Sequence, residues 1–438
     1  MFGTSGIRGP VGESVTADLA LSVGRALASE GYERVVLGRD ARESGHLLSD
    51  ATAAGIMECG GTVLDVGVVA TPTVARAVGW LEADAGVVIT ASHNPPTDNG
   101  IKLWTPSGRA FDRDEQAAIE TRLEADSYAL ADWEGVGRRE CRSVEHRHRA
   151  AIGQAVSVAD PPPVVVDVGN GCGGITADAL DSLGAHVRTL NAQRDGSFPG
   201  RPSEPTDETL ESLCTLVGAI DDAIGVAHDG DADRLVAVDE LGRFVPKDVL
   251  LALFARDAAD AGDRVAVPVD TSLAVDDALA AVGASATRTR VGDVFVAERT
   301  TEPDVVFGGE PSGAWIWPDE TACPDGPLAA CKLLEIVDAA DSLATLVDGI
   351  ETYPIRRESL ETDDRSGLMA AVESAVTDQY DDVSTLDGVR VRQERGWFLV
   401  RPSGTEPLVR ITAEGRTEEA SAALLEDARI LLENAHEA

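Results

Sequence analysis

The sequence predicts an α/β protein built from three similar mixed α/β domains around a central cleft and a smaller C-terminal α+β domain. Its 438 residues exceed what one hydrophobic core usually holds. Three stretches of the chain open and close with the same pattern of apolar runs and turns. The residues after 345 follow a different pattern, which indicates a separate, smaller module.

Each repeated stretch opens with a β-branched run, a turn and a helix-like segment, which predicts a strand followed by a helix. These openings lie at 34–45, 163–174 and 264–275. Each stretch closes with an apolar run that enters a polar, often glycine-containing loop, at 85–94, 223–233 and 303–313. Such alternation predicts largely parallel sheets, in which ligands bind at the carboxyl ends of the strands.

The domains are predicted at 1–150, 151–245, 246–345 and 346–438. The polar stretch 126–162, which ends next to three consecutive prolines, is predicted to be a linker. In the last domain, helices are expected at 364–380 and 417–436, and strands at 388–400 and 407–414.

Composition narrows the possible partners and the location of the protein. Acidic residues number 76 against 37 basic ones, for a net charge of −39, which repels nucleic acid and anionic membranes. With only three lysines, the acid-rich chain resembles proteins of salt-loving archaea. The six cysteines show no paired spacing, and no signal peptide or long apolar run occurs, so a cytoplasmic protein is expected.

The loop TASHNPPTDNGIK, from Thr90 to Lys102, places Ser92 directly after a buried strand. A serine there can act as a nucleophile if a base or a cation activates it, and His93 and Lys102 lie in the same loop. The alternative is an ordinary strand-to-helix turn in which Ser92 caps the helix.

The loop HDGDADR, residues 228–234, carries Asp229, Asp231 and Asp233 at alternate positions. Their carboxylates can converge on one hard divalent cation. An EF-hand calcium loop is excluded because Arg234 stands where that loop needs glycine. A solvated acidic turn is the other alternative in so acidic a chain.

Two further loops carry groups suited to a sugar phosphate. GGEPSG, residues 308–313, combines flexible glycines with Glu310 and Ser312, which can bind adjacent hydroxyls, although a plain turn fits this string equally well. RPSGTEPLVR, residues 401–410, gathers arginines, hydroxyls and backbone N–H groups suited to a phosphate dianion.

In this order the four loops, with the opening FGTSGIRG, resemble the α-D-phosphohexomutase superfamily across the whole chain. The resemblance implies that Ser92 is the phosphoserine, that Asp229, Asp231 and Asp233 bind one Mg²⁺ with it, and that Lys102 assists acid–base work. His93 and Arg8 would lie at the same catalytic site. The substrate-binding residues that it implies are Arg234, Glu310, Ser312, Arg401, Ser403, Gly404, Thr405 and Arg410.

Several short strings, ASHNPPTDNGIK, RVGDVFVAE and SGTEPLVR, resemble the phosphoglucosamine mutase branch of that superfamily, whereas Pro311 and Ala314 depart from its bacterial sugar loop. The expected reaction interconverts glucosamine 6-phosphate and glucosamine 1-phosphate, with glucosamine 1,6-bisphosphate or a similar compound as intermediate and activator. A phosphoglucomutase or phosphomannomutase of broad specificity, a serine-based sugar phosphatase and a non-catalytic sensor stay open as alternatives. The expected partner is a small hexose phosphate, without nucleic acid or membrane, and no oligomeric state is predicted.

Overall fold

The structure is a computed structural model that describes residues 2–3, 6–340, 342–362, 364–403 and 407–437. The chain divides into two compact units. Unit 1 comprises Met1–Leu250 and Ser312–Val347, and unit 2 comprises Leu251–Pro311 and Asp348–Ala438. Among the described residues, none of the helices combines the length and the apolar character needed to cross a membrane.

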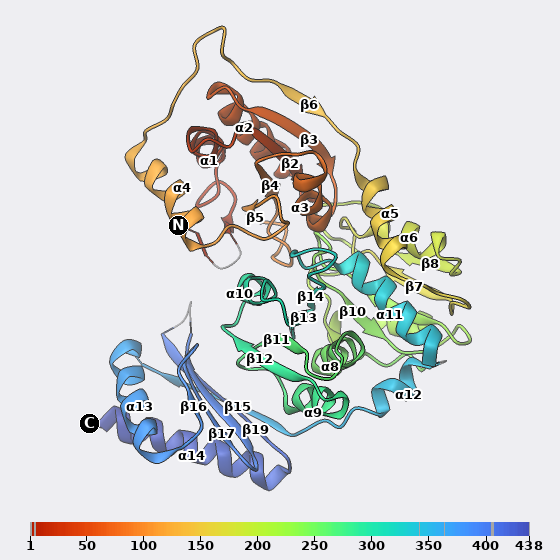
Figure 1. Ribbon diagram of the computed structural model, residues 1–438, viewed down its shortest axis with the longest axis vertical. Coiled ribbons are helices and arrows are strands. Elements are labelled where there is room, and N and C mark those ends of the chain that lie inside the picture. Colours follow the sequence, from red (N-terminus) through yellow and green to blue (C-terminus); the bar gives the residue numbers. More distant parts are fainter. Residues whose placement is uncertain (1, 4–5, 341, 363, 404–406, 438) are drawn as a thin grey trace. The chain divides into compact units, whose positions relative to one another are not determined.

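Unit 1 opens with a six-stranded mixed sheet in the order β1-β5-β4-β2-β3-β6 (Figure 1). The pairs β2–β3, β2–β4 and β3–β6 are parallel, whereas β1–β5 and β4–β5 are antiparallel. Its strands are β1 Ile7–Pro10, β2 Arg34–Arg39, β3 Thr62–Val68, β4 Ala85–Ile89, β5 Asp98–Trp104 and β6 Arg139–Cys141. The accompanying helices are α1 Ala17–Ser29, α2 Gly45–Glu58, α3 Thr71–Trp80, α4 Arg113–Ala125 and α5 Glu145–Ala155.

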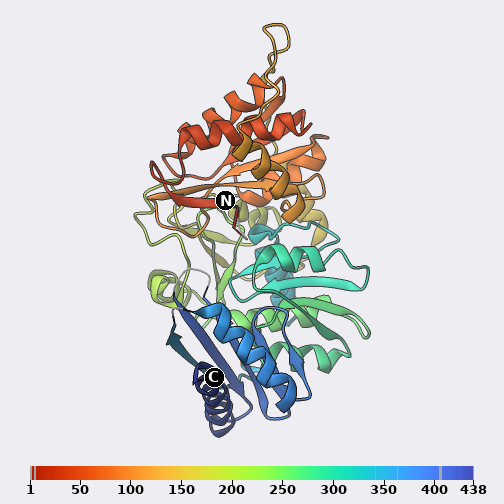
Figure 2. The same cartoon turned by 90° about the vertical axis from the view of Figure 1, so that its left-hand side faces the viewer.

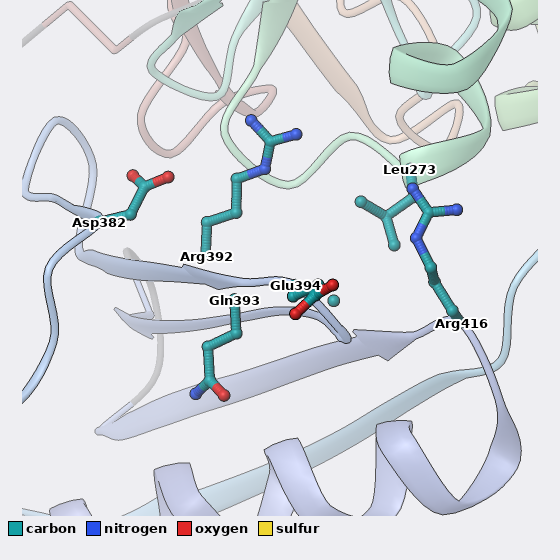
Figure 3. Close-up of a pocket in the computed structure, with 7 residues that line it drawn as sticks. Leu273, Asp382, Arg392, Gln393, Glu394 and Arg416 are labelled. Atoms are coloured by element: carbon teal, nitrogen blue, oxygen red, sulfur yellow. The ribbon is translucent and has the colours of Figure 1, made fainter.

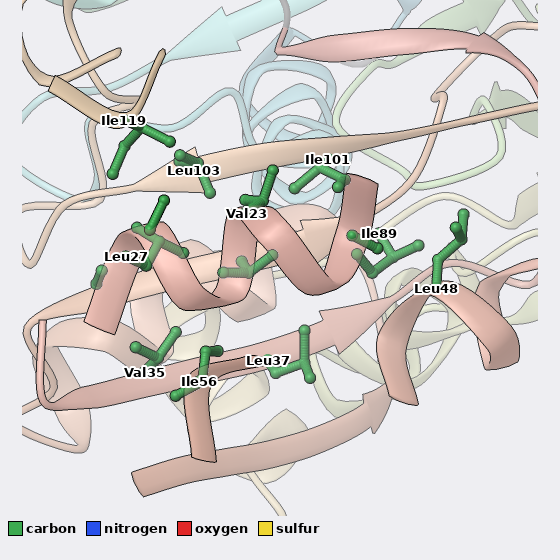
Figure 4. Close-up of a cluster of buried hydrophobic side chains, with 14 of the residues drawn as sticks. Val23, Leu27, Val35, Leu37, Leu48, Ile56, Ile89, Ile101, Leu103 and Ile119 are labelled. Atoms are coloured by element: carbon green, nitrogen blue, oxygen red, sulfur yellow. The ribbon is translucent and has the colours of Figure 1, made fainter. Parts of the chain in front are cut away.

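Helices cover both faces of this sheet. Successive strand residues point to opposite faces, so a strand that is apolar at every position needs a hydrophobic partner on each side. Val35 and Leu37 of β2 pack in one hydrophobic cluster with residues of α1 and α2 (Figure 4). Val36, between them, packs in a second cluster with residues of α3. The continuous apolar run of β2 therefore marks a strand buried on both sides, as the sequence predicted.

A second sheet of unit 1 has the order β10-β9-β7-β8, with β7–β8 and β7–β9 parallel and β9–β10 antiparallel. Its strands are β7 Val164–Asp167, β8 Val187–Leu190, β9 Ile224–Ala227 and β10 Val236–Val238. The helices around it are α6 Gly174–Ser182, the short 3₁₀ helix Asp207–Thr209 and α7 Glu211–Val217. The second segment of unit 1 contributes β14 Ala314–Ile316 and α11 Gly326–Ala340, and α12 Leu343–Asp348 begins in it.

Unit 2 begins within α8 Lys247–Ala258 and contains the parallel strands β12, β11 and β13. These strands are β11 Arg264–Pro268, β12 Ser285–Thr289 and β13 Val305–Glu310, and the helices between them are α9 Leu273–Val282 and α10 Asp293–Arg299. The three repeated α/β segments that the sequence predicted are thus confirmed.

The C-terminal part of unit 2 is an antiparallel sheet in the order β15-β19-β18-β17-β16. Its strands are β15 Ile355–Glu361, β16 Val383–Ser384, β17 Val389–Gln393, β18 Gly396–Pro402 and β19 Leu408–Gly415. Helices α13 Arg365–Gln379 and α14 Glu418–Glu437 lie side by side against it and share one hydrophobic core with the strands (Figures 1 and 2). This confirms the α+β character of the last module.

Two local expectations were wrong. The stretch 126–162 is more than a linker, because it contains β6, which pairs with β3, and helix α5. The predicted strand 388–400 is a hairpin, in which Gln393 pairs with Gly396 across the two residues between them. A polar turn of only two residues barely interrupts the apolar pattern, which is why the sequence read as one strand.

Candidate active site

The loop of Ser92 and the loop of the three aspartates are both hairpin loops in unit 1. The first joins the antiparallel strands β4 and β5, where Ile89 pairs with Ile101. The second joins β9 and β10, where Ala227 pairs with Val236. Since a strand follows Ser92, the alternative in which it caps a helix is excluded.

Ser92 is 1% exposed, and its hydroxyl points at the aspartate loop. Its Oγ donates to Asp229 Oδ2 at 2.6 Å and lies 3.4 Å from Asp233 Oδ1. Its backbone has φ +51°, a left-handed conformation that non-glycine residues seldom adopt. Backbone strain of this kind is typical of functional positions and persists only where neighbouring groups hold the residue in place.

Arg42 is the main support of this loop, although it was not among the residues that the sequence predicted for the site. Its guanidinium is fully buried and donates to four carbonyl oxygens, those of Ser92, Asn94, Pro95 and Asp98, at 2.5 to 2.9 Å. Nε pairs with Asp40 Oδ2 at 2.9 Å. One available signal was that Asp40 and Arg42 follow β2, whose carboxyl end lies beside that of β4.

Ser203 connects the two hairpin loops, and nothing in the sequence pattern pointed to it. Its Oγ donates to the Ser92 carbonyl at 2.8 Å and accepts from the Gly230 N–H at 3.0 Å. A Cβ on Gly230 would lie 2.8 Å from Ser203 Oγ and 3.0 Å from the Ser92 carbonyl oxygen. Only glycine fits at this contact between the loops.

The three aspartates form a compact acidic cluster, in which one ligand oxygen from each lies within 4.8 Å of the others. Asp229 and Asp231 are fully buried and Asp233 is 4% exposed. Asp231 Oδ2 accepts from Thr71 Oγ1 at 2.6 Å and lies 3.1 Å from Thr90 Oγ1. Asp231 Oδ1 is buried and accepts no hydrogen bond from the described residues. An orphaned carboxylate oxygen beside two further carboxylates fits a divalent cation.

The pKa values of Asp229 and Asp233 are shifted in opposite directions. Burial, reinforced by the charges of Asp233 and Asp231, raises the pKa of Asp229 well above its ordinary value. Burial alone would also raise the pKa of Asp233, but the cations of Lys102 and Arg234 outweigh it and hold this pKa low. A buried cluster of this kind is stabilised by added positive charge.

Lys102, on β5, contributes such charge. Its Nζ donates to Asp233 Oδ2 at 2.7 Å and lies 3.6 Å from Asp231 Oδ2. His93 Nδ1 lies 3.4 Å from Ser92 Oγ. Burial and then the charges of Arg234 and Arg8 lower the pKa of His93 to about 3, so its imidazole is neutral at pH 7.

Arg8 and Arg234 are the other predicted residues of unit 1 near the serine. Arg8 lies on β1 opposite Gly100 of β5, and its buried Nε has no hydrogen-bond partner among the described residues. Arg234 lies 4.0 Å from Asp233 Oδ1 through Nε, and its backbone forms a β-bridge with Ala314, the first residue of β14. The structure therefore places the predicted residues Arg8, Ser92, His93, Lys102, Asp229, Asp231, Asp233 and Arg234 at or beside one cluster.

The remaining predicted residues lie mostly in unit 2. Glu310 ends β13 and accepts from the Gly292 N–H at 2.9 Å, while Ser312 belongs to unit 1. Arg401 and Arg410 are paired positions on β18 and β19, which places both side chains on one face of the sheet. Ser403 is buried, and its N–H donates to the Leu408 carbonyl at 2.9 Å. Gly404 and Thr405 lie outside the described residues.

A separate pocket of about 320 Å³ in unit 2 holds none of the predicted residues (Figure 3). It is lined by Leu273, Asp382, Arg392, Gln393, Glu394, Gly396 and Arg416. The guanidinium of Arg416 is engaged by Asp277 at 2.9 and 3.0 Å. With lining charges of both signs and one arginine already paired, this pocket indicates no ligand.

Comparison with known families covers nearly the whole chain. The models of phosphoglucomutase/phosphomannomutase alpha/beta/alpha domains I, II and III match residues 1–129, 145–242 and 246–353. The model of the phosphoglucomutase/phosphomannomutase C-terminal domain matches residues 357–431.

Relatives match over almost their full lengths. A probable phosphoglucosamine mutase of Methanothermobacter thermautotrophicus is 43% identical, with 99% of this chain and 98% of the relative covered. Another, of Methanopyrus kandleri, is 44% identical, with 95% of this chain and 94% of the relative covered. A phosphoglucomutase/phosphomannomutase family protein of Burkholderia thailandensis has a crystal structure that matches with a TM-score of 0.89 at 29% identity, covering 100% of this chain and 98% of that one.

Proposed function

The chain belongs to the phosphoglucomutase/phosphomannomutase family, and from this premise we propose that it interconverts glucosamine 6-phosphate and glucosamine 1-phosphate. It acts as an intramolecular phosphotransferase, with phosphorylated Ser92 as the phosphoryl donor. The observation that carries this proposal is the 2.6 Å contact between Ser92 Oγ and Asp229 in a buried acidic cluster. That contact puts a nucleophilic hydroxyl beside a cation site.

We assign Asp229, Asp231 and Asp233 as ligands of one Mg²⁺ per chain, together with an oxygen on Ser92. Oxygen donors of this kind suit Mg²⁺, and the orphaned Asp231 Oδ1 supports the assignment. When bound, the cation neutralises charge on the phosphoryl oxygens and lowers the barrier to transfer.

The chemical step follows from the positions of the chain's own groups. The sugar hydroxyl oxygen forms a bond to phosphorus and gives up its proton, while the bond from phosphorus to Ser92 Oγ breaks and Oγ leaves with the bonding electrons. We assign acid–base work to Lys102, which takes up the proton of the sugar hydroxyl and returns one to Ser92 Oγ, so that the step is proton-neutral. The imidazole of His93 lies 3.4 Å from Oγ and, with a pKa of about 3, stays neutral and serves as a hydrogen-bond partner of that oxygen. Arg8 and Arg234 add positive charge near the transferring group.

The same step in reverse returns a phosphoryl group to Ser92 from the other end of the sugar 1,6-bisphosphate. A second site has to hold the phosphate that is not reacting. We assign this anchoring to Arg401, Ser403, Gly404, Thr405 and Arg410, and the sugar hydroxyls to Glu310 and Ser312. The shared face of Arg401 and Arg410 supports the anchoring role, because two guanidinium groups can bind one dianion.

The amino sugar is proposed as the substrate because the archaeal relatives at 43% and 44% identity carry the name of that mutase. A phosphoglucomutase or phosphomannomutase of broad specificity is the second candidate, favoured by the family to which the chain belongs. Glucosamine 1,6-bisphosphate, or a similar compound, is proposed as the activator that restores phospho-Ser92. The cytoplasmic location and the domain boundaries at 150, 245 and 345 stay predictions.

A coupled assay at high salt, with Mg²⁺ and a trace of sugar 1,6-bisphosphate, tests the proposal. Turnover of glucosamine, glucose and mannose phosphates is compared, and intact-mass measurement follows phosphorylation of Ser92. We expect preference for the amino sugar, and loss of turnover but retention of sugar-phosphate binding in Ser92→Ala. Preference for glucose or mannose would reassign the substrate, and release of phosphate without isomer formation would identify a phosphatase.

A further inference from the structure

Asp387 occupies the turn between β16 and β17 in unit 2 and joins two segments that are distant in sequence. Its Oδ1 lies 3.1 Å from Arg401 Nε on β18, and the two side chains form an ion pair. Its Oδ2 accepts from the backbone N–H of Val291 at 3.0 Å. The two carboxylate oxygens of Asp387 therefore bind two different segments, β18 through Oδ1 and the backbone at Val291 through Oδ2.

The turn that carries Asp387 is fixed from both sides. Arg290 Nε donates to the Leu386 carbonyl oxygen at 3.2 Å. Gly388 has φ +74°, and a Cβ there would lie 2.3 Å from the Val400 carbonyl oxygen and 3.0 Å from Arg401 Cα. A glycine is required at this position, so the backbone of the turn lies directly against the backbone of Arg401.

The contacts continue from Val291 to the proposed sugar-binding residue. The next residue, Gly292, donates its N–H to Glu310 Oε1 at 2.9 Å. A short path of hydrogen bonds and one peptide unit thus runs from Arg401 through Asp387 and the 291–292 segment to Glu310. One end of this path is a proposed phosphate contact, and the other is a proposed hydroxyl contact.

We propose that Asp387 is a positioning residue that fixes Arg401 and the 291–292 segment together, so that phosphate anchoring and hydroxyl recognition keep one geometry. This inference rests on the proposed function, which assigns Arg401 to the phosphate and Glu310 to the hydroxyls. Its physical reason is preorganisation. The Arg401 side chain is 36% exposed. Because Asp387 already holds its Nε, Arg401 loses less conformational entropy on binding a phosphate than an unrestrained arginine would.

Asp387→Asn is the sharpest test because it keeps the size of the side chain. An asparagine offers one acceptor oxygen, whereas Arg401 and Val291 each present a donor, so one contact must be lost. We expect the KM for the hexose phosphate and the Kd for inorganic phosphate, measured by calorimetry, each to rise about tenfold. We expect kcat to change by less than about threefold, and discrimination between hexose phosphates that differ in one hydroxyl to fall.

A matched control is Asp427→Asn, which breaks the ion pair between Asp427 and Arg395. The side chains of this pair have an exposure comparable to that of the Asp387–Arg401 pair, 33% for Asp427 and 42% for Arg395. The control substitution should leave KM and phosphate binding unchanged. The double variant Asp387→Asn/Arg401→Ala should bind phosphate no more weakly than Arg401→Ala alone, because Asp387 acts through Arg401. Full additivity of the two losses, or behaviour of Asp387→Asn like the control, would overturn the proposal.

Thermal unfolding of each variant establishes that it is folded. If Asp387→Asn does not fold, Asp387→Glu replaces it. Glutamate keeps the charge, but its longer side chain displaces both carboxylate oxygens by one methylene. A phosphate Kd of this variant equal to that of the wild type would again overturn the proposal. The calorimetric measurement needs no turnover. Failure of the wild-type enzyme to isomerise the amino sugar would therefore count against the proposed function alone, while unchanged phosphate binding in the variant would count against Asp387 alone.

Discussion

At the scale of single residues, Asp231 differs from the aspartates beside it in how its two oxygens are used. Oδ2 accepts hydrogen bonds from the hydroxyl groups of Thr71 and Thr90, whereas Oδ1 has no hydrogen-bond partner among the described residues. An unsatisfied buried carboxylate oxygen is costly, and a divalent cation satisfies it. The cation site is thus expected to depend on the charge of this one residue.

We predict that Mg²⁺ raises the melting temperature of the cation-free wild type but not that of Asp231→Asn. A ligand at a hundred times its Kd stabilises the folded state by about 2.7 kcal/mol, which is readily seen by calorimetry. The asparagine keeps an oxygen for Thr71 and Thr90, so the fold is retained while the charge is lost. The measurement is thermal unfolding with increasing Mg²⁺ after treatment with a chelator.

The control for this prediction is Asp239→Asn, which removes a buried carboxylate paired with Arg243 outside the cluster. It should lower the melting temperature without Mg²⁺ and keep the full increase with Mg²⁺. An equal Mg²⁺ response in wild type and Asp231→Asn would show that this aspartate is not a ligand.

At the scale of an element, the hairpin loop after β4 is held by Arg42, which lies outside the loop, in addition to the hydrogen bonds within the loop itself. The loop residues accept four hydrogen bonds from the buried guanidinium, and Ser92 is held at φ +51° among them. Thr90 reinforces the same region, since its Oγ1 accepts from the Ser92 N–H at 2.9 Å. A planar group with five donors suits this task, whereas lysine has three donors on one atom.

We predict that Arg42→Met lowers the free energy of unfolding by about 3 to 5 kcal/mol, because it leaves the Asp40 carboxylate buried without its cation. Urea denaturation measures the change. The folded fraction should also lose most of its mutase activity, since the loop that places Ser92 loses its support. Arg149→Met is the comparison, since it breaks an exposed pair with Asp178 and should change the free energy of unfolding by no more than about 1 kcal/mol. Equal effects of the two substitutions would contradict the role given to Arg42.

At the scale of the whole molecule, the dominant property is charge. A net charge of −39 on 438 residues produces mutual repulsion that opposes the compact state. Salt shortens the range of this repulsion, from a Debye length of about 10 Å at about 0.1 M to about 3 Å at about 1 M.

We predict that the melting temperature rises when KCl is raised from about 0.1 M to about 1 M. Low concentrations of guanidinium chloride should also stabilise the protein because they screen charge, whereas urea at the same concentrations should not. This comparison separates charge screening from other effects of salt. A melting temperature that is insensitive to KCl would refute the expectation of a salt-adapted protein.

The sequence by itself determined the repeated α/β segments and the residues of the two principal loops. These features are local: apolar runs predict buried strands, and Asp229, Asp231 and Asp233 lie close in space partly because they are close in the chain. It misjudged 126–162 and 388–400, where a short edge strand, a polar helix and a two-residue turn leave weak periodic signals.

Only the tertiary structure decided how the serine loop is held and which groups join distant segments. Thr71 reaches Asp231 across 160 positions of sequence, and Ser203 reaches Ser92 across 111. Asp387 likewise meets Val291 across 96 positions. Hydrophobic periodicity reports which face of an element is buried, but it carries no information on which polar groups the packed elements then bring within hydrogen-bonding distance.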